Sequence, residues 1–137
     1  MSEIEAARHV LETEAVAIRL AGERLDGAFV KAVDLLYVDK GKIVITGLGK
    51  SGHVGRKIAA TFCSTGAPAV FMHAAEASHG DLGVHQSRDP VIFLSNSGST
   101  GELQGLVPAF RERESSLIGI LGNPRGPLAC KVDVVLD

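Results

Sequence analysis

Residues 42–52 have the sequence Lys42-Ile43-Val44-Ile45-Thr46-Gly47-Leu48-Gly49-Lys50-Ser51-Gly52. The β-branched residues before Gly47 favour a buried strand. Gly47 and Gly49 then permit backbone conformations and a close ligand approach that a side chain would block. A helix that begins at Ser51 would direct its free amides and its positive dipole end toward an anion. This order of strand, turn and helix predicts a phosphate-binding segment.

The length and composition of the chain indicate a single compact α/β domain. It has 137 residues, of which 45% are apolar and 16 are glycine, and few are aromatic. The formal net charge of −2 offers no basic surface, so we expect neither nucleic acid nor an anionic membrane as a partner. No apolar stretch approaches the roughly 20 residues that span a bilayer.

The two cysteines, Cys63 and Cys130, lie far apart in the sequence and form no CxxC pair. No secretory leader is apparent either. We expect reduced thiols, packed as small core residues of a cytoplasmic protein.

Residues 1–40 are predicted to form two helices. An apolar stripe with three- and four-residue steps indicates the first, over residues 2–21; its members are Ile4, Ala7, Leu11, Ala15 and Ile18. Ser2 and Glu5 match a capping box. Phe29, Val33 and Leu36 indicate a second, shorter helix that ends before Gly41. Because both helices precede the first strand, we expect them to serve packing or oligomerisation beside a core of residues 41–137.

Strands and helices alternate from residue 41 onward. We expect strands over 42–46, 69–73, 91–94, 116–121 and 132–136, helices over 51–64 and 101–113, an irregular polar loop over 74–85 and a further loop over 123–127. This alternation predicts a parallel sheet with right-handed crossovers, and hence a three-layer αβα sandwich with a five-stranded parallel sheet.

The loop after the third predicted strand is rich in hydroxyl groups, carried by Ser95, Ser97, Ser99 and Thr100. Because the carboxyl ends of parallel strands meet at one edge, this loop should converge with the turn at Ser51. Hydroxyls and helix-terminal amides can hold a phosphate without arginines, each bond contributing about 1.5–3 kcal/mol. Helix capping remains the alternative for any single hydroxyl, and an ordinary turn for Asn96.

Two charged residues follow these turns. Lys50 lies between two loop glycines, either as a solvated lysine or as a ligand contact. Glu102 lies in the first turn of its helix, where the helix dipole alone could explain a carboxylate. A carboxylate beside a bound sugar phosphate could also act as a proton-transfer base.

Three histidines, His73, His79 and His85, recur at six-residue intervals. Three imidazoles could bind zinc, but the spacing matches no compact ligand signature, so we expect no metal and keep His73 as the single weak candidate. Polar loop residues or contacts to substrate hydroxyls explain all three histidines better.

Nucleotide binding is a weaker interpretation of the same glycines. Gly47, Gly49 and Gly52 satisfy GxGxxG after a strand, the pattern of dinucleotide-binding proteins. The second strand, however, ends at His73 where an acidic residue is expected. The segment also fails as a P-loop, because the first glycine of that motif would fall at Val44.

Three segments together resemble the sugar isomerase (SIS) domain, and within it the arabinose-5-phosphate isomerase family. They are Gly47-Leu48-Gly49-Lys50-Ser51-Gly52, Ala74-Ala75-Glu76-Ala77-Ser78-His79-Gly80-Asp81-Leu82-Gly83 and Ser95-Asn96-Ser97-Gly98-Ser99-Thr100-Gly101-Glu102. The resemblance covers residue 40 to the end and implies a flavodoxin- or Rossmann-like fold. It implies that five residues bind the sugar phosphate, namely Ser51, Ser95, Asn96, Ser97 and Thr100.

The resemblance also implies roles in catalysis for Lys50 and Glu102, and roles at the substrate for His73 and His79. We expect Glu102 to act as the base, Lys50 to stabilise the oxyanion or phosphate, and His79 to assist ring opening or proton relay. No cofactor is expected, and the partners implied are a sugar phosphate and further copies of the chain in a homodimer or homotetramer.

The sequence departs from this family at two places. Ser99 stands where the family usually has an acidic residue, and the helices with an HPGG-like segment and the paired CBS modules are absent. The first hypothesis is therefore an aldose-ketose isomerase interconverting D-ribulose 5-phosphate and D-arabinose 5-phosphate, or the core of one. A non-catalytic phosphosugar-binding SIS module is the second hypothesis, and a dinucleotide-binding oxidoreductase is the third.

Overall fold

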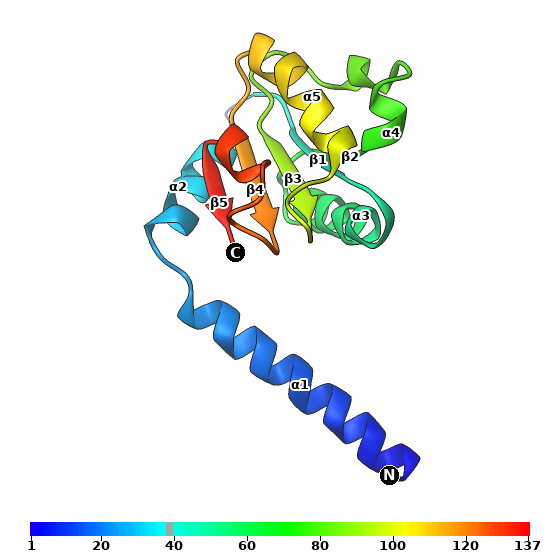
Figure 1. The fold of residues 1–137 in the computed structure, drawn as a ribbon. Helices are drawn as coiled ribbons and strands as arrows, with labels where there is room; N and C mark the ends of the chain where they lie inside the picture. The colour runs from blue at the N-terminus through cyan, green and yellow to red at the C-terminus, as the bar shows by residue number, and fades with distance from the viewer. Residues whose placement is uncertain (38–39) are drawn as a thin grey trace.

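The structure is a computed structural model that describes residues 1–37 and 40–137 (Figure 1). Its elements are, in order, α1 (Glu3–Glu23), α2 (Gly27–Leu36), β1 (Ile43–Gly47), α3 (Gly49–Ser64), β2 (Ala69–His73), α4 (Ala74–Ala77), η1 (Asp81–Val84), β3 (Val91–Ser95), α5 (Gly101–Glu112), β4 (Leu117–Leu121), η2 (Ala129–Lys131) and β5 (Val134–Leu136). The predicted strands and principal helices are confirmed to within a few residues at their ends.

The five strands form one sheet in the order β2-β1-β3-β4-β5, and every pair is parallel. The predicted five-stranded parallel sheet is thus confirmed. The chain leaves β1 toward one edge of the sheet and leaves β3 toward the other. In an open α/β sheet, this change of direction leaves a crevice beyond the carboxyl ends of the two strands concerned, β1 and β3.

Helices cover both faces of the sheet, as the three-layer prediction requires (Figure 1). On one face, alternate strand residues such as Val44 and Phe93 pack against Leu103 and Phe110 of α5. On the other face, Ile45 and its neighbours pack against α2 and α3. Because successive strand residues point to opposite faces, the β-branched run of β1 serves both layers at once.

The segment between β2 and η1 is more regular than predicted. Instead of an irregular loop over residues 74–85, α4 continues directly from β2 and a 3₁₀ turn, η1, follows it. Ala74 and Ala77 are buried in the cluster that also holds Leu103 of α5. Small alanine side chains on one side of α4 allow this short helix to lie close to α5, which explains the added structure.

The prediction of free thiols is confirmed, but the prediction that the two cysteines are core residues is wrong. Cys63 and Cys130 are free thiols, but both are exposed and neither belongs to the core. Cys63 lies in the last turn of α3 and Cys130 in η2, where their thiols contact the carbonyls of Ala69 and Pro127. The small apolar side chains of these two cysteines therefore did not indicate core positions, because both lie at exposed ends of helical segments.

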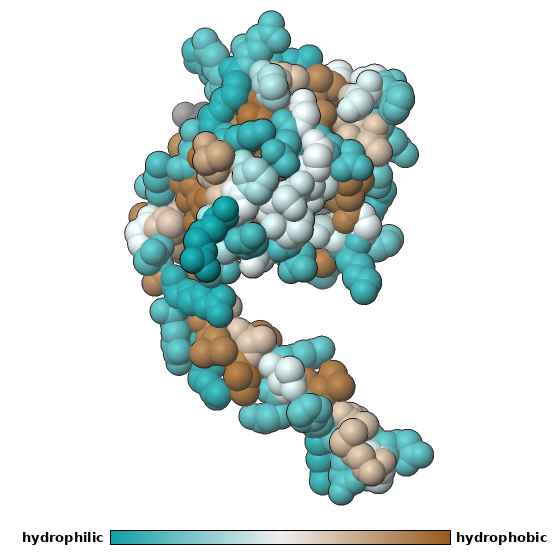
Figure 2. Space-filling view, viewed as in Figure 1, coloured by the Kyte–Doolittle hydropathy of each residue, from teal (hydrophilic) through white to brown (hydrophobic). Residues whose placement is uncertain are grey.

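The two N-terminal helices differ from each other. The predicted capping box of α1 is confirmed, since the Ser2 hydroxyl accepts from the Glu5 amide and the Glu5 carboxylate accepts from the Ser2 amide. No residue of α1 is buried, and the helix projects away from the rest of the chain (Figures 1 and 2). In contrast, α2 buries Ala32 against the sheet. Among the described residues, no helix has the length and apolar character needed to cross a membrane.

Candidate functional site

The turn from β1 into α3 brings the backbone of two elements into direct contact. A Cβ atom at Gly47 would lie 3.2 Å from the carbonyl carbon of Ser51 and 3.3 Å from the carbonyl oxygen of Leu94. Gly49 has a φ of +53°, in the left-handed region that favours glycine. In the structure α3 begins at Gly49 rather than at Ser51, so Lys50 and Ser51 lie in its first turn.

A pocket of about 260 Å³ lies at the crevice beside this turn. Its polar lining comes from the start of α3, with Lys50 and Ser51, and from the end of β3 and the residue after it, Ser95 and Asn96. The wall is completed by Val54, Leu94, Ile120 and Gly122. The predicted meeting of the first and third loops is therefore present in the structure. Lys50 is exposed and makes no ion pair with the residues that the structure describes.

The serine-rich turn is held together by its own hydroxyls. Ser95 is only 4% exposed; its Oγ accepts a hydrogen bond from the Gly98 amide at 3.0 Å and lies 2.8 Å from Thr100 Oγ1. Thr100 is the residue before α5, yet its side chain does not cap that helix. The capping interpretation is therefore wrong for Thr100. Because the two hydroxyls are hydrogen-bonded to each other, no side chain in the described part of the chain caps the amides in the first turn of α5.

The tip of this turn is exposed. Asn96, Ser97 and Ser99 lie there, and all three residues are exposed. The Ser97 hydroxyl accepts from the Ser99 amide at 3.2 Å and from the Ser99 hydroxyl at 3.1 Å. The turn thus presents two hydroxyls and a carboxamide beside the start of a helix, which suits an anionic oxygen ligand.

A second loop, residues 122–128 after β4, supports the serine-rich turn through backbone contacts. A Cβ atom at Gly126 would lie 2.6 Å from the carbonyl oxygen of Gly98, and one at Gly98 would lie 2.5 Å from that of Asn123. The Leu128 amide donates to the same Gly98 carbonyl at 2.9 Å. The sequence predicted no more than a loop over 123–127; the pair Gly122 and Gly126 was the signal that could have indicated close backbone packing.

The remaining predicted catalytic residues lie outside the pocket. Glu102 is exposed in the first turn of α5, after the serine-rich turn. His79 is exposed between α4 and η1, and its amide donates to the Glu76 carbonyl. The segment that carries His79 packs beside α5 through Ala74 and Ala77 (Figure 1). Neither side chain lines the pocket of Lys50 and Ser51.

His73 ends β2 next to Gly47, its partner in the register of β1 and β2. Its Nδ1 atom is buried and makes no hydrogen bond with the described residues, and the same holds for Thr46 Oγ1. The ring packs edge-on against Phe71 with a centroid distance of 6.4 Å. His73 therefore lies at the carboxyl edge, as predicted, and within the described residues one of its ring nitrogens has no protein partner.

His85, in contrast, belongs to a buried network at the opposite, amino edge of the sheet. It lies in a loop, as expected, but it is buried there, with only 3% of its surface exposed. Its Nε2 lies 2.8 Å from Ser115 Oγ and its Nδ1 lies 3.2 Å from Arg113 Nη1. Burial lowers the pKa of His85, although the Asp89 carbonyl opposes that effect.

Asp89 is the charged centre of this network. It is 2% exposed and accepts hydrogen bonds from the Lys42 ammonium at 2.7 Å, the Lys42 amide at 3.1 Å and the Gln86 amide at 2.9 Å. Burial alone would raise the pKa of Asp89, but these bonds outweigh it and hold the pKa below the usual value.

The three histidines of the sequence pattern thus lie in different surroundings. Within residues 1–37 and 40–137, no group of three or more His, Cys, Asp or Glu side chains is placed to hold a metal ion.

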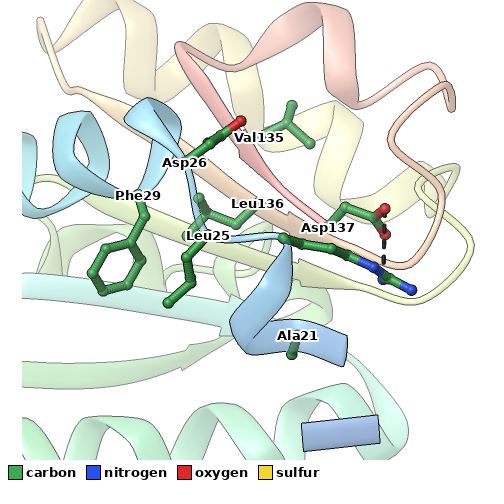
Figure 3. Close-up of a pocket in the computed structure, with 8 residues that line it drawn as sticks. Ala21, Leu25, Asp26, Phe29, Val135, Leu136 and Asp137 are labelled. Carbon is green, nitrogen blue, oxygen red and sulfur yellow. Dashed lines mark ion pairs between the residues drawn. The ribbon is translucent and has the colours of Figure 1, made fainter. Parts of the chain in front are cut away.

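Larger hollows lie away from these loops. One of about 320 Å³ lies where α1 ends beside β5, and includes Leu25, Phe29 and Leu136 (Figure 3). Another of about 400 Å³ lies between α2 and α3 and is lined by apolar side chains. Volume alone therefore does not identify the site; the polar residues that α3 and the end of β3 bring together do.

Comparison with known proteins gives consistent matches. The SIS domain matches residues 35–137. The chain is 52% identical over 127 residues to arabinose 5-phosphate isomerase KdsD of Pseudomonas aeruginosa, and 44% identical over 134 residues to arabinose 5-phosphate isomerase GutQ of Escherichia coli K12. It also resembles the solved structure of Escherichia coli CFT073 c3406 in complex with arabinose 5-phosphate, with a TM-score of 0.84 and 34% identity over all of this chain and 74% of that one.

The matched region is a part of the longer relatives. The alignments cover 93% and 98% of this chain but only 38% of the Pseudomonas protein and 42% of the Escherichia coli K12 protein. The chain therefore spans about two fifths of the length of these two relatives.

Proposed function

Because the chain belongs to the SIS domain family, we propose that it binds a phosphosugar at the crevice between the first and third loops. The observation that carries this proposal is the pocket that Lys50 and Ser51 share with Ser95 and Asn96. The relative solved with arabinose 5-phosphate supports a pentose 5-phosphate as the ligand class.

Within this proposal the phosphate group binds where hydroxyls and helix N-termini converge. Ser51, Asn96 and Ser97 supply direct contacts, and the amides at the start of α5 add the positive end of a helix dipole. Ser95 is buried and bonded to Thr100, so its contribution, and that of Thr100, is to hold the turn in shape. Lys50 adds a positive charge that is free to approach the ligand.

The reaction we propose is the interconversion of D-ribulose 5-phosphate and D-arabinose 5-phosphate. A base removes the proton from C1 of the ketose or C2 of the aldose, an enediolate forms, and the proton returns to the neighbouring carbon. We assign the base to Glu102, stabilisation of the enediolate oxygen to Lys50, and assistance in ring opening to His79. His73, whose buried Nδ1 makes no hydrogen bond with the described residues, is proposed to contact a sugar hydroxyl.

A phosphosugar-binding module without catalysis is the second candidate. One observation favours it: Glu102 and His79 do not line the pocket. The phosphate site would then serve recognition alone.

A thermal-shift screen followed by an isomerase assay separates these candidates. Arabinose 5-phosphate should raise the melting temperature more than inorganic phosphate, because a ligand that binds only the folded state stabilises it. Turnover of arabinose 5-phosphate that is lost in Glu102→Gln, with the thermal shift retained, supports the isomerase. Binding without turnover in the unsubstituted chain supports the module. A shift with NAD or NADP and none with phosphosugars would favour the dinucleotide alternative and contradict both.

We further propose that the chain forms a homodimer or homotetramer through its N-terminal helices. We also propose a cytoplasmic setting, supported by the free exposed thiols of Cys63 and Cys130, which a reducing compartment preserves.

A further inference from the structure

The segment that carries His79 is exposed over most of its length and is attached to the core at its two ends. Residues 78–81 are all exposed, between the buried Ala77 of α4 and the half-buried Leu82 of η1. Ala77 belongs to the core cluster that includes residues of α5, and Leu82 lies against the same cluster. The position of His79 therefore depends on how firmly these two ends are attached to α5, the helix whose first turn carries Glu102.

Arg113, the residue that follows α5, attaches the second of these ends. Its Nη1 atom donates to the Leu82 carbonyl at 2.8 Å and lies 3.2 Å from both the carbonyl oxygen and the Nδ1 atom of His85. The Arg113 carbonyl in turn accepts from the Arg88 amide at 2.9 Å. Among the described residues, no other side chain outside residues 78–84 forms a hydrogen bond with that stretch.

The contact with His85 also fixes the proton on the imidazole. A guanidinium only donates, so Nδ1 of His85 accepts and the ring proton is on Nε2. The Ser115 hydroxyl accepts that proton at 2.8 Å. The neutral ring packs edge-on against Phe110 of α5, with a centroid distance of 4.8 Å. Arg113 thus joins η1 to a histidine that is itself fixed against α5.

From these contacts we propose that Arg113 is a positioning residue for the isomerase reaction. By holding η1 against the end of α5, it fixes where His79 lies relative to Glu102 at the start of the same helix. A displacement of about 1 Å can cost about 100-fold in rate. Arg113 does not line the phosphate pocket, so its loss should slow conversion and spare phosphosugar binding. This inference rests on the proposed function, because the effect on turnover passes through His79.

Steady-state kinetics with arabinose 5-phosphate provide the first test, in which Arg113→Met is compared with Arg88→Met. The two arginines adjoin each other, but the Arg88 side chain bonds only to the exposed Glu114 carboxylate. We expect Arg113→Met to lower kcat at least about tenfold with KM unchanged within about twofold, and Arg88→Met to change neither. Arg113→Lys, which keeps a donor for the Leu82 carbonyl, should recover part of kcat.

A double-mutant cycle with His79→Ala distinguishes positioning from a merely structural role. If Arg113 acts through His79, Arg113→Met lowers kcat much less in the His79→Ala chain than in the unsubstituted chain. General damage to the fold would lower kcat by the same factor in both. Equal factors, or an unchanged kcat in Arg113→Met, would overturn the proposal.

Hydrogen exchange measures the attachment itself. The amides of residues 78–84 should exchange at least about tenfold faster in Arg113→Met than in the unsubstituted chain or in Arg88→Met, with the thermal shift by arabinose 5-phosphate retained. If Arg113→Met does not fold, Arg113→Lys serves for the same measurements. Unchanged exchange would contradict the proposal.

The outcomes also separate this inference from the proposed function. If the unsubstituted chain does not convert arabinose 5-phosphate, the isomerase assignment fails and the role of Arg113 fails with it. If the unsubstituted chain converts arabinose 5-phosphate and Arg113→Met does so equally well, only the role of Arg113 is contradicted.

Discussion

The two edges of the sheet carry similar residue types in opposite arrangements. At the amino edge, Lys42, Asp89 and His85 form a buried network in which each charged or polar group has a partner. At the carboxyl edge, Lys50 and Ser51 lie in the pocket lining, with Lys50 exposed and making no ion pair with the described residues. A buried polar group without a partner is costly, whereas an exposed one keeps its water until a ligand replaces it.

This difference separates a stabilising role from a binding role. At the amino edge the side chains bond to each other, so we expect substitutions there to change the free energy of unfolding. At the carboxyl edge the serine-rich turn is held by the Ser95 and Thr100 hydroxyls and by backbone contacts such as Gly98 with Gly126. Exposed side chains such as that of Lys50 are left unused by the described part of the fold. We expect substitutions of those side chains to change ligand affinity instead.

The largest expected effect on stability is that of Asp89→Ala. The change leaves the Lys42 ammonium and the Lys42 and Gln86 amides without their acceptor, so we expect a loss of about 3 kcal/mol in the free energy of unfolding. Urea denaturation measures it, with the exposed Glu112→Ala as control. A loss no larger than that of the control would show that the amino edge is not a stabilising network.

A smaller effect is expected from Gly126→Ala, which acts on the carboxyl edge through the backbone. The added methyl group would meet the Gly98 carbonyl, so we expect about 1–3 kcal/mol of destabilisation together with weaker phosphosugar binding. Gly105→Ala is the matched control, because its Cβ has open space within α5 and alanine favours a helix there. If a folded Gly126→Ala chain bound phosphosugars as well as the unsubstituted chain, the loop of residues 122–128 would have no role in shaping the site.

The smallest expected effect is the pH dependence of the amino edge. Burial lowers the pKa of His85 from its ordinary value of 6.5, so the unfolded chain binds the proton more tightly than the folded one. Stability is therefore full above about pH 6.5 and falls as the pH decreases below it; Asp89, whose pKa lies below its ordinary 3.8, adds a further loss in more acidic solution.

Melting temperatures between about pH 7.5 and 5 measure this dependence. His85→Gln should flatten it, whereas the exposed His53→Gln should leave it intact. A profile that is identical in His85→Gln and in the unsubstituted chain would assign the dependence to other groups.

The sequence predicted the carboxyl edge better than the amino edge, for a physical reason. Glycines and hydroxyls directly after a β-branched run are typical of a tight turn beside a ligand, so residues 42–52 and 95–102 indicated both the sheet and the site. A histidine such as His85, by contrast, has the same local sequence features whether it is exposed or buried. Only the packing of residues distant in the sequence, such as Ser115, decided its burial.

Two further features could not be predicted from local patterns. The contact between Gly98 and Gly126 joins two loops that are separated by α5 and β4, and nothing in either segment specifies its partner. The spacing of apolar residues in α1 predicted a helix with an apolar face, but this spacing does not indicate what covers that face. In the described part of the chain, nothing covers it.

The central claim, that the pocket of Lys50 and Ser51 binds the phosphate of a sugar, is tested most directly by calorimetric titration of arabinose 5-phosphate. Ser51→Ala should weaken binding by at least about tenfold, because a hydrogen bond to a charged oxygen is worth about 1.5–3 kcal/mol, with little change in stability. Ser64→Ala, in the last turn of α3, should bind like the unsubstituted chain. Equal affinity of all three proteins, or no binding by any of them, would contradict the account.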